Sequence, residues 1–206
     1  MYCGGSHVMI IVVTGGIGSG KSEVSRILAD RYSLPVYQAD AQVKRLYKQD
    51  DHLVCMIEKS LNMSLRGENG RFEPSLLAAR IFTDKDALHA VEELVFPYLI
   101  EDFNEFASRH SAYVVFESAT ILDKPQFDGF GDVVVLVDAP LQTRIDRAVR
   151  RDASSPEKVL ERIANQKVPS DDPRISYVIM NDGTLDELGQ KVERLMESIA
   201  EDINKK

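Results

Sequence analysis

The sequence predicts an α/β fold in which helices cover a parallel sheet, and two observations predict it. Short apolar runs alternate with amphipathic segments, beginning with residues 9–16 (MIIVVTGG) and 21–32 (KSEVSRILADRY). Such alternation is typical of strand–helix–strand units. The runs at residues 112–118 (AYVVFES) and 132–140 (DVVVLVDAP) are almost entirely apolar. Central strands of a parallel sheet read in this way because helices bury both of their faces.

The other expected elements follow along the chain. They are a strand at residues 34–40 (LPVYQAD), a helix at 41–50, a charged helical segment at 141–166 interrupted near 154–156, a last strand at 176–183 and an amphipathic helix from 184 onwards. Residues 53–110 carry helical patterns without a clear strand, and we expect Pro97 to break or kink the last helix there.

The patterns therefore predict a core with a helical insertion. The expected parts are a core domain at residues 9–50 and 112–200 that includes a lid at about 142–170, a helical domain at 51–111, and an extension or tag at 1–8.

Composition excludes some classes of function. The 206-residue chain has a net charge of -8, whereas nonspecific binding of nucleic acid requires a basic face. The longest apolar run is far too short to cross a bilayer. We therefore expect a cytoplasmic protein with neither a nucleic-acid nor a membrane partner.

Residues 15–22 (GGIGSGKS) match the phosphate-loop pattern G-x-x-x-x-G-K-[ST] between an expected strand and an expected helix. Glycines let a polyphosphate reach backbone amides, and the helix that follows directs its free N–H groups at the same anion. Lys21 is expected to reach the outer phosphates, and the Ser22 hydroxyl to bind Mg²⁺ directly. The expected nucleotide-binding residues of this segment are Gly15, Gly16, Ile17, Gly18, Ser19, Gly20, Lys21, Ser22 and Glu23.

A phosphate loop indicates a nucleotide but leaves the reaction open. No N-K-x-D segment for reading guanine is present, so a GTPase is not indicated. A small phosphate-loop protein with a helical insertion and an arginine-rich helix suggests a kinase for a small molecule, which needs a lid to exclude water. Arg147 and Arg151 lie four residues apart and share a helix face. They either clasp the transferring phosphoryl group or pair with Asp146 and Asp152 on a solvated helix.

Two carboxylates are candidates for catalysis and metal binding. Asp40 is expected to end the second strand, at the edge where open α/β sheets bind ligands. There it either accepts a proton from an acceptor hydroxyl or caps the next helix. Glu117 ends the next expected strand, and it either holds Mg²⁺ through water or caps a loop.

These residues resemble a known family. The phosphate loop with the VYQAD strand, VVVLVDAPLQTRIDRAVRRD, RIANQ and VIMNDG together resemble dephospho-coenzyme A kinase, from about Met9 to Leu195. The resemblance implies a phosphate-loop NTPase core, a helical domain that binds coenzyme A, and a lid. It implies transfer of phosphate from ATP, with Mg²⁺, to the ribose 3′-hydroxyl of dephospho-coenzyme A in the last step of coenzyme A synthesis.

The same resemblance implies roles for individual residues. Asp40 matches the base for the acceptor hydroxyl, Arg147 and Arg151 match the lid arginines, and Asn181 falls where the last strand of the family turns near adenine.

The chain also departs from the pattern of the family. Gln38 stands where the family usually has aspartate, and Glu23 where threonine is common. An arginine is expected near Pro74, and a histidine where Phe96 stands. The last two departures bear on acceptor recognition. Two alternatives therefore remain: a kinase for another small alcohol or nucleoside, and a non-catalytic nucleotide-binding or coenzyme A-sensing protein.

Overall fold

The computed structural model describes residues 8–166 and 168–205, so seven residues of the expected extension at 1–8 lie outside the described part. The chain forms two compact units. The core unit comprises Met1–Gln38 and Arg109–Lys206, and the helical unit comprises Ala39–Ser108. Each unit has its own hydrophobic core.

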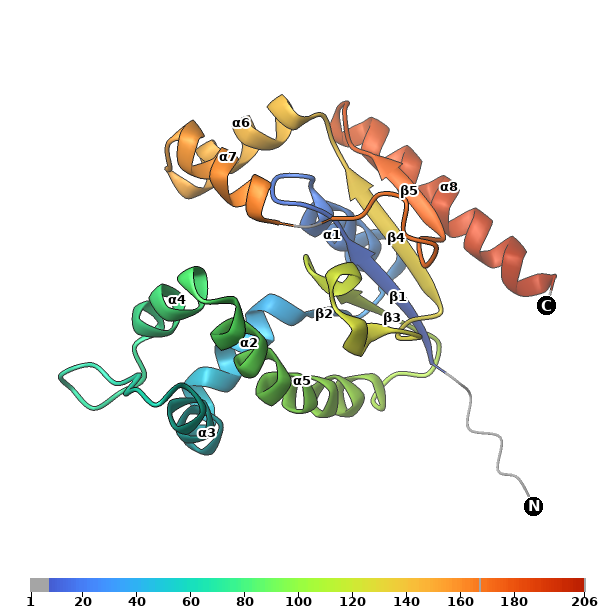
Figure 1. The fold of residues 1–206 in the computed structure, drawn as a ribbon. Coiled ribbons are helices and arrows are strands. Elements are labelled where there is room, and N and C mark those ends of the chain that lie inside the picture. The colour runs from blue at the N-terminus through green and yellow to red at the C-terminus, as the bar shows by residue number, and fades with distance from the viewer. Residues whose placement is uncertain (1–7, 167, 206) are drawn as a thin grey trace, which may run out of the picture. The chain divides into compact units, whose positions relative to one another are not determined.

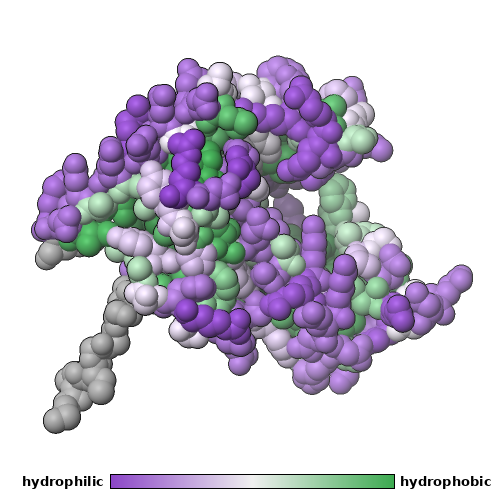
Figure 2. Space-filling view, turned by 180° about the vertical axis from the view of Figure 1, so that it is seen from behind, coloured by the Kyte–Doolittle hydropathy of each residue, from purple (hydrophilic) through white to green (hydrophobic). Residues whose placement is uncertain are grey.

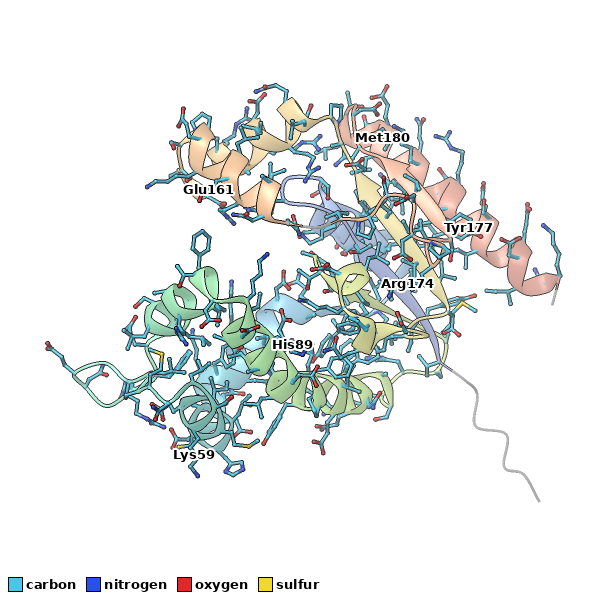
Figure 3. The ribbon with its side chains drawn as sticks, viewed as in Figure 1. Lys59, His89, Glu161, Arg174, Tyr177 and Met180 are labelled. Carbon is cyan, nitrogen blue, oxygen red and sulfur yellow. The ribbon has the colours of Figure 1, made fainter. Side chains whose placement is uncertain are left out.

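The core unit contains a five-stranded sheet in which every neighbouring pair is parallel (Figure 1). Its spatial order is β2-β3-β1-β4-β5, with β1 at the centre. The strands are β1 (Met9–Thr14), β2 (Val36–Gln38), β3 (Tyr113–Glu117), β4 (Val133–Asp138) and β5 (Tyr177–Met180). Figure 3 labels Tyr177 and Met180 at the two ends of β5. The parallel α/β fold expected from the sequence is confirmed.

Two helices cover one face of this sheet. α1 (Lys21–Tyr32) follows β1, and α8 (Leu185–Asn204) closes the chain (Figure 1). Side chains that alternate along β1, such as Ile11 and Val13, pack with Leu28 of α1 and Val192 of α8. These side chains are at most 4% exposed. Every second side chain of β1 therefore packs in one core with the apolar faces of the two helices.

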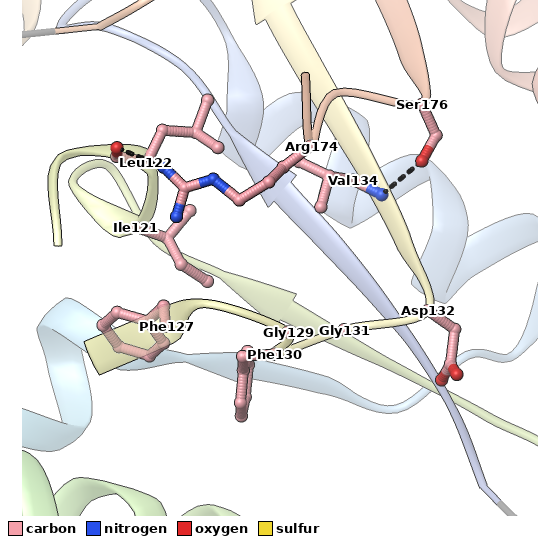
Figure 4. A pocket seen from close by; sticks show the side chains of 10 residues that line it. All are labelled: Ile121, Leu122, Phe127, Gly129, Phe130, Gly131, Asp132, Val134, Arg174 and Ser176. Carbon is pink, nitrogen blue, oxygen red and sulfur yellow. Dashed lines mark hydrogen bonds between the residues drawn. The ribbon is translucent and has the colours of Figure 1, made fainter. Parts of the chain in front are cut away.

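The other face of the sheet carries an aromatic cluster. Phe116 of β3 stacks with Tyr37 and contacts Phe127 and Phe130, which lie in and after the short 3₁₀ helices η1 (Ile121–Asp123) and η2 (Pro125–Phe127). A cavity of about 160 Å³ lies beside these rings (Figure 4). Arg174 extends over this cavity and donates a hydrogen bond to the Leu122 carbonyl at 2.6 Å.

Two helices follow β4. α6 (Leu141–Asp152) ends at Ala153, whose φ is 48°, and α7 (Pro156–Asn165) begins after Ser155, whose hydroxyl accepts from the Lys158 amide. The interruption expected near residues 154–156 is confirmed, because a left-handed residue followed by an N-cap and a proline stops one helix and starts another.

The helical unit contains four helices. They are α2 (Ala39–Gln49), α3 (Asp51–Leu61), α4 (Pro74–Thr83) and α5 (Lys85–Ala107). Its core includes Leu53, Ile57 and Leu77. The helical unit begins at Ala39 rather than at residue 51, because α2 packs on α3 and α5 and forms an Arg45–Asp102 ion pair with α5.

Two details differ from the expectation. β2 ends at Gln38, the last residue that pairs with β3, so Asp40 lies in the first turn of α2 rather than at the end of a strand. α5 continues through Pro97 without the expected break, and the alternative, a kink at this residue, stays a prediction. Pro97 is exposed, so the carbonyl that loses its partner N–H can be hydrated, while Val95 and Leu99 stay buried on the packed face.

The surface fits the charge of the chain. In the space-filling view, hydrophilic residues cover most of the face shown, with smaller hydrophobic areas among them (Figure 2). No helix in the described part of the chain has the length and apolar character needed to cross a membrane.

Candidate nucleotide-binding site

The phosphate loop, Glu117 and Asn181, which the sequence predicted as site residues, lie at the carboxyl edge of the sheet, and Asp138 joins them there. The phosphate loop follows β1, Glu117 ends β3, Asp138 ends β4, and Asn181 comes directly after β5. Because all strands are parallel, these four strand ends share one edge, where open α/β sheets bind ligands.

The loop between β1 and α1 presents backbone amides. Gly20 caps α1 in a left-handed conformation, with φ 95°, and its carbonyl accepts from the Glu23 and Val24 amides at 3.0 and 3.1 Å. Lys21 and Ser22 are the first two residues of the helix. Their amides therefore belong to the first turn, where N–H groups lack partners within the helix and the dipole favours an anion.

The glycines of the loop also permit close packing. A Cβ atom on Gly18, whose φ is 76°, would overlap the backbone carbonyl of Arg144 in α6. A Cβ atom on Gly20 would overlap the side-chain amide of Asn181. The loop is thus held between α6 and the residue after β5, and larger residues do not fit there.

Ser22 and Glu117 bring two side-chain oxygen atoms side by side. The Ser22 hydroxyl donates to Glu117 Oε1 at 2.5 Å, and Gln38 Nε2 lies 3.5 Å from Glu117 Oε2. Glu117 is only 7% exposed. Mg²⁺ prefers oxygen ligands and is usually bound by one or two protein groups together with substrate phosphates. A hydroxyl and a buried carboxylate next to a phosphate loop fit that ion.

Arg147 and Asn181 support the loop from the other side. Asn181 Nδ2 donates to the Ser19 carbonyl at 2.9 Å, and Arg147 donates to the Asn181 carbonyl at 3.1 Å and to its Oδ1 at 3.3 Å. Arg147 Nη1 also lies 3.5 Å from the Ser19 carbonyl. Asn181 therefore holds the loop by a buried hydrogen bond. The position of Asn181 near the adenine of the nucleotide, which the resemblance implies, stays a prediction.

Arg151 has a different environment. Its guanidinium donates to both carboxylate oxygens of Asp152 at 2.7 and 3.0 Å, and Arg162 donates to the same carboxylate. These hydrogen bonds raise the pKa of Arg151 and hold the pKa of the Asp152 carboxyl well below its usual range. Of the two expected lid arginines, Arg147 contacts the loop, and Arg151 is bound to the neighbouring aspartate.

Two candidates remain, Glu23 and Asp40. Glu23 points along α1 and pairs with Arg26, whose hydrogen bond lowers the pKa of Glu23. Asp40 is exposed in the helical unit. It follows Gln38 by two residues, and Gln38 pairs in register with Glu117.

Two loop contacts come from residues of the expected lid segment at about 142–170 to which the sequence analysis gave no individual role. Arg144 Nε donates to the Ile17 carbonyl at 3.0 Å, and the Ile17 amide donates to Gln166 Oε1 at 2.8 Å. Arg144 lies one helical turn before Arg147 and so shares its face of α6. Gln166 is the last residue of the RIANQ segment. The position of Arg144 one turn before Arg147 and the place of Gln166 in RIANQ were the sequence features that could have drawn attention to these residues. Neither feature indicates a contact with a loop about 130 to 150 residues away in sequence.

Comparisons with known proteins show the family of the chain. The family described as CoaE: Dephospho-CoA kinase matches residues 9–187. A dephospho-CoA kinase of Bacteroides fragilis is 35% identical over 179 residues, 84% of each chain, and one of Porphyromonas gingivalis is 37% identical over 162 residues, 78% of each chain.

A solved structure shows the same arrangement. The crystal structure of TT1252 from Thermus thermophilus has a TM-score of 0.76 at 30% identity, and the match covers 93% of this chain and 98% of that chain. The resemblance found in the sequence is confirmed, and the chain belongs to the dephospho-CoA kinase family.

Proposed function

We propose that the protein transfers the γ-phosphoryl group of ATP to the ribose 3′-hydroxyl of dephospho-coenzyme A, which gives coenzyme A and ADP. The observation that carries this proposal is the phosphate loop, with its first-turn amides at the carboxyl edge of the sheet and its Ser22 hydroxyl bonded to buried Glu117. Membership of the dephospho-CoA kinase family supports the choice of acceptor.

The residues of the core unit have separate tasks in the mechanism. The amides of the loop and of the first turn of α1 bind the phosphates, and Lys21 neutralises charge that develops on the transferring group. Ser22 and Glu117 would hold Mg²⁺, which supplies further charge neutralisation at the phosphates. Arg147 adds positive charge beside the loop, and Arg151 would join it when the Asp152 pair opens.

The acceptor side of the reaction belongs to the helical unit. The acceptor hydroxyl gives its proton to the Asp40 carboxylate as its oxygen forms a bond to the γ-phosphorus. The bond between that phosphorus and the bridging oxygen breaks, and ADP leaves with the electron pair. The helical unit would bind the coenzyme A part of the acceptor, and Pro74 and Phe96 are the positions where its contacts should differ from those of relatives.

The test is to mix the purified protein with ATP, Mg²⁺ and dephospho-coenzyme A and to measure release of ADP with and without the acceptor. Release that depends on dephospho-coenzyme A supports the proposal. Release only with another small alcohol would favour a kinase of different specificity, and nucleotide binding without turnover would favour a sensor.

Asp40→Asn tests the assignment of the base. The amide cannot accept the proton, so we expect turnover to fall by about 10²-fold or more while ATP affinity changes little. Asp30→Asn is the matched control, because Asp30 is exposed on α1 and pairs with Arg26. An unchanged rate in the Asp40 variant would remove this carboxylate from the mechanism.

A further inference from the structure

The main chain of Ile17 is held on both sides by side chains from the segment that follows β4. Its amide donates to Gln166 Oε1 at 2.8 Å, and its carbonyl accepts from Arg144 Nε at 3.0 Å. The two groups belong to different peptide planes, one before and one after the Cα of Ile17. Together the two hydrogen bonds fix the backbone of the phosphate loop at this residue.

Arg144 is itself positioned by its surroundings. Its side chain is 16% exposed, and Nη1 lies 3.9 Å from Asp138 Oδ1 at the end of β4. The guanidinium lies so close to Gly16 that a Cβ atom there would overlap it. The Nη2 end of the Arg144 guanidinium therefore lies against the bare backbone at Gly16, where a Cβ atom would leave no room for it.

Gln166 is positioned by a second hydrogen bond. Its Nε2 donates to the Ala119 carbonyl at 3.1 Å, in the segment after β3. An amide side chain that donates to one carbonyl must present its oxygen to the other group. The Ala119 contact therefore orients the Gln166 oxygen toward the Ile17 amide.

This arrangement has a consequence for phosphate binding. In a planar trans peptide the carbonyl and the following N–H point in opposite directions. When Arg144 holds the Ile17 carbonyl, the Gly18 amide points away from α6. Because Gly18 is a glycine with φ 76°, the peptide between the two residues meets little resistance to flipping. A flip would direct a carbonyl oxygen, rather than an N–H, to the side where anions bind.

We propose that Arg144 and Gln166 are positioning residues that hold the phosphate loop at Ile17 in the orientation that binds a polyphosphate. The inference rests on the proposed function in that this loop is the ATP site. It assigns these two residues a task distinct from that of Arg147, whose partners are Asn181 and the Ser19 carbonyl.

The experiment compares the binding of ADP and of adenosine by titration calorimetry, without acceptor. Arg144→Met keeps the length of the side chain and removes the donors, and Arg150→Met makes the same change at an exposed position of α6. Gln166→Leu is paired with Gln142→Leu, because Gln142 is exposed and its side-chain amide donates to Asp146 on the same helix.

We expect Arg144→Met to weaken ADP binding about tenfold, and Gln166→Leu about three- to tenfold, with adenosine affinity unchanged. Arg144→Lys retains one donor without the planar fork, so it should recover part of the loss. The two control variants should bind both ligands like the wild type. A residue that only fastens α6 would lower the melting temperature and leave the ratio of ADP to adenosine affinity unchanged.

The outcomes separate this inference from the proposed function. Unchanged ADP affinity in Arg144→Met and Gln166→Leu, or an equal loss for adenosine, overturns the positioning role even if the wild type phosphorylates dephospho-coenzyme A. A selective loss for ADP supports it even if another acceptor proves to be the substrate. If Arg144→Met does not fold, Arg144→Lys and Gln166→Leu decide the question by the same ratio.

Discussion

Asn181→Ala should destabilise the core unit and loosen the phosphate loop together. Asn181 is 6% exposed, and its Nδ2 donates to the carbonyl of Ser19, a residue that is completely buried. The variant removes this hydrogen bond and the one that Asn181 Oδ1 accepts from Arg147, and it leaves the buried Ser19 carbonyl without its main partner, which costs about 1–3 kcal/mol. Arg147 lies 3.5 Å from the same carbonyl and can compensate only in part. We therefore expect a loss of about 2 kcal/mol in the free energy of unfolding.

The assay is thermal unfolding followed by circular dichroism, with and without ADP. For a chain of about 200 residues, 2 kcal/mol corresponds to a fall of roughly 4–8 °C in the melting temperature. The stabilisation by saturating ADP should also shrink, because the loop that binds it is less well fixed. Asp182→Asn is the control, since that side chain is about half exposed and pairs with Lys191, and it should shift the melting temperature little. A fall below about 1 °C in the Asn181 variant would refute this account of the Ser19 contact.

Three further changes test other parts of the core unit. Gly18→Ala should destabilise more than Gly70→Ala, because both glycines have φ above 70° but a Cβ atom meets α6 only at Gly18; the difference in unfolding free energy measures the clash. Thr184→Ala removes the capping box of α8 and should cost about 1 kcal/mol in urea unfolding. Hydrogen bonds from Arg174 lower the pKa of Asp172 to about 2. The stability that Asp172→Asn removes should therefore be fully present above about pH 4 and be lost as the pH falls toward 2. If wild type and variant differ in unfolding free energy by the same amount across that range, the Asp172–Arg174 ion pair does not have this effect.

Sequence patterns predicted the elements whose signals are local. The β-branched run of β1, the glycines after it and the proline that starts α7 each fix their structure within a few residues, and these elements appear where expected. Expectations failed where tertiary packing overrides local preference. Asp40 joins α2 because the pairing of β2 ends at Gln38. The helix break that was one of the two expected effects of Pro97 does not occur, because Pro97 is exposed while its neighbours pack.

The contacts that hold the phosphate loop could not be predicted in this way. Ile17 meets Gln166 across 149 positions of sequence, and Ser19 meets Asn181 across 162. In the sequence, a glutamine or asparagine that makes such a long-range contact looks no different from one on the surface. Their role appears only when the parallel sheet brings its strand ends to one edge.

The charge of the site also depends on local pairing rather than on composition. The chain as a whole carries -8, which argues against anionic partners in general. At the loop, however, the recorded hydrogen bonds of Arg147 go to the oxygens of Ser19 and Asn181, which are neutral. Neutral acceptors fix a guanidinium without cancelling its charge, whereas the carboxylate of Asp152 largely neutralises Arg151. An acidic protein can keep a positive field at one sheet edge. We therefore expect Arg147 to contribute positive charge to the site as it stands, whereas Arg151 must leave its carboxylate before it can contribute.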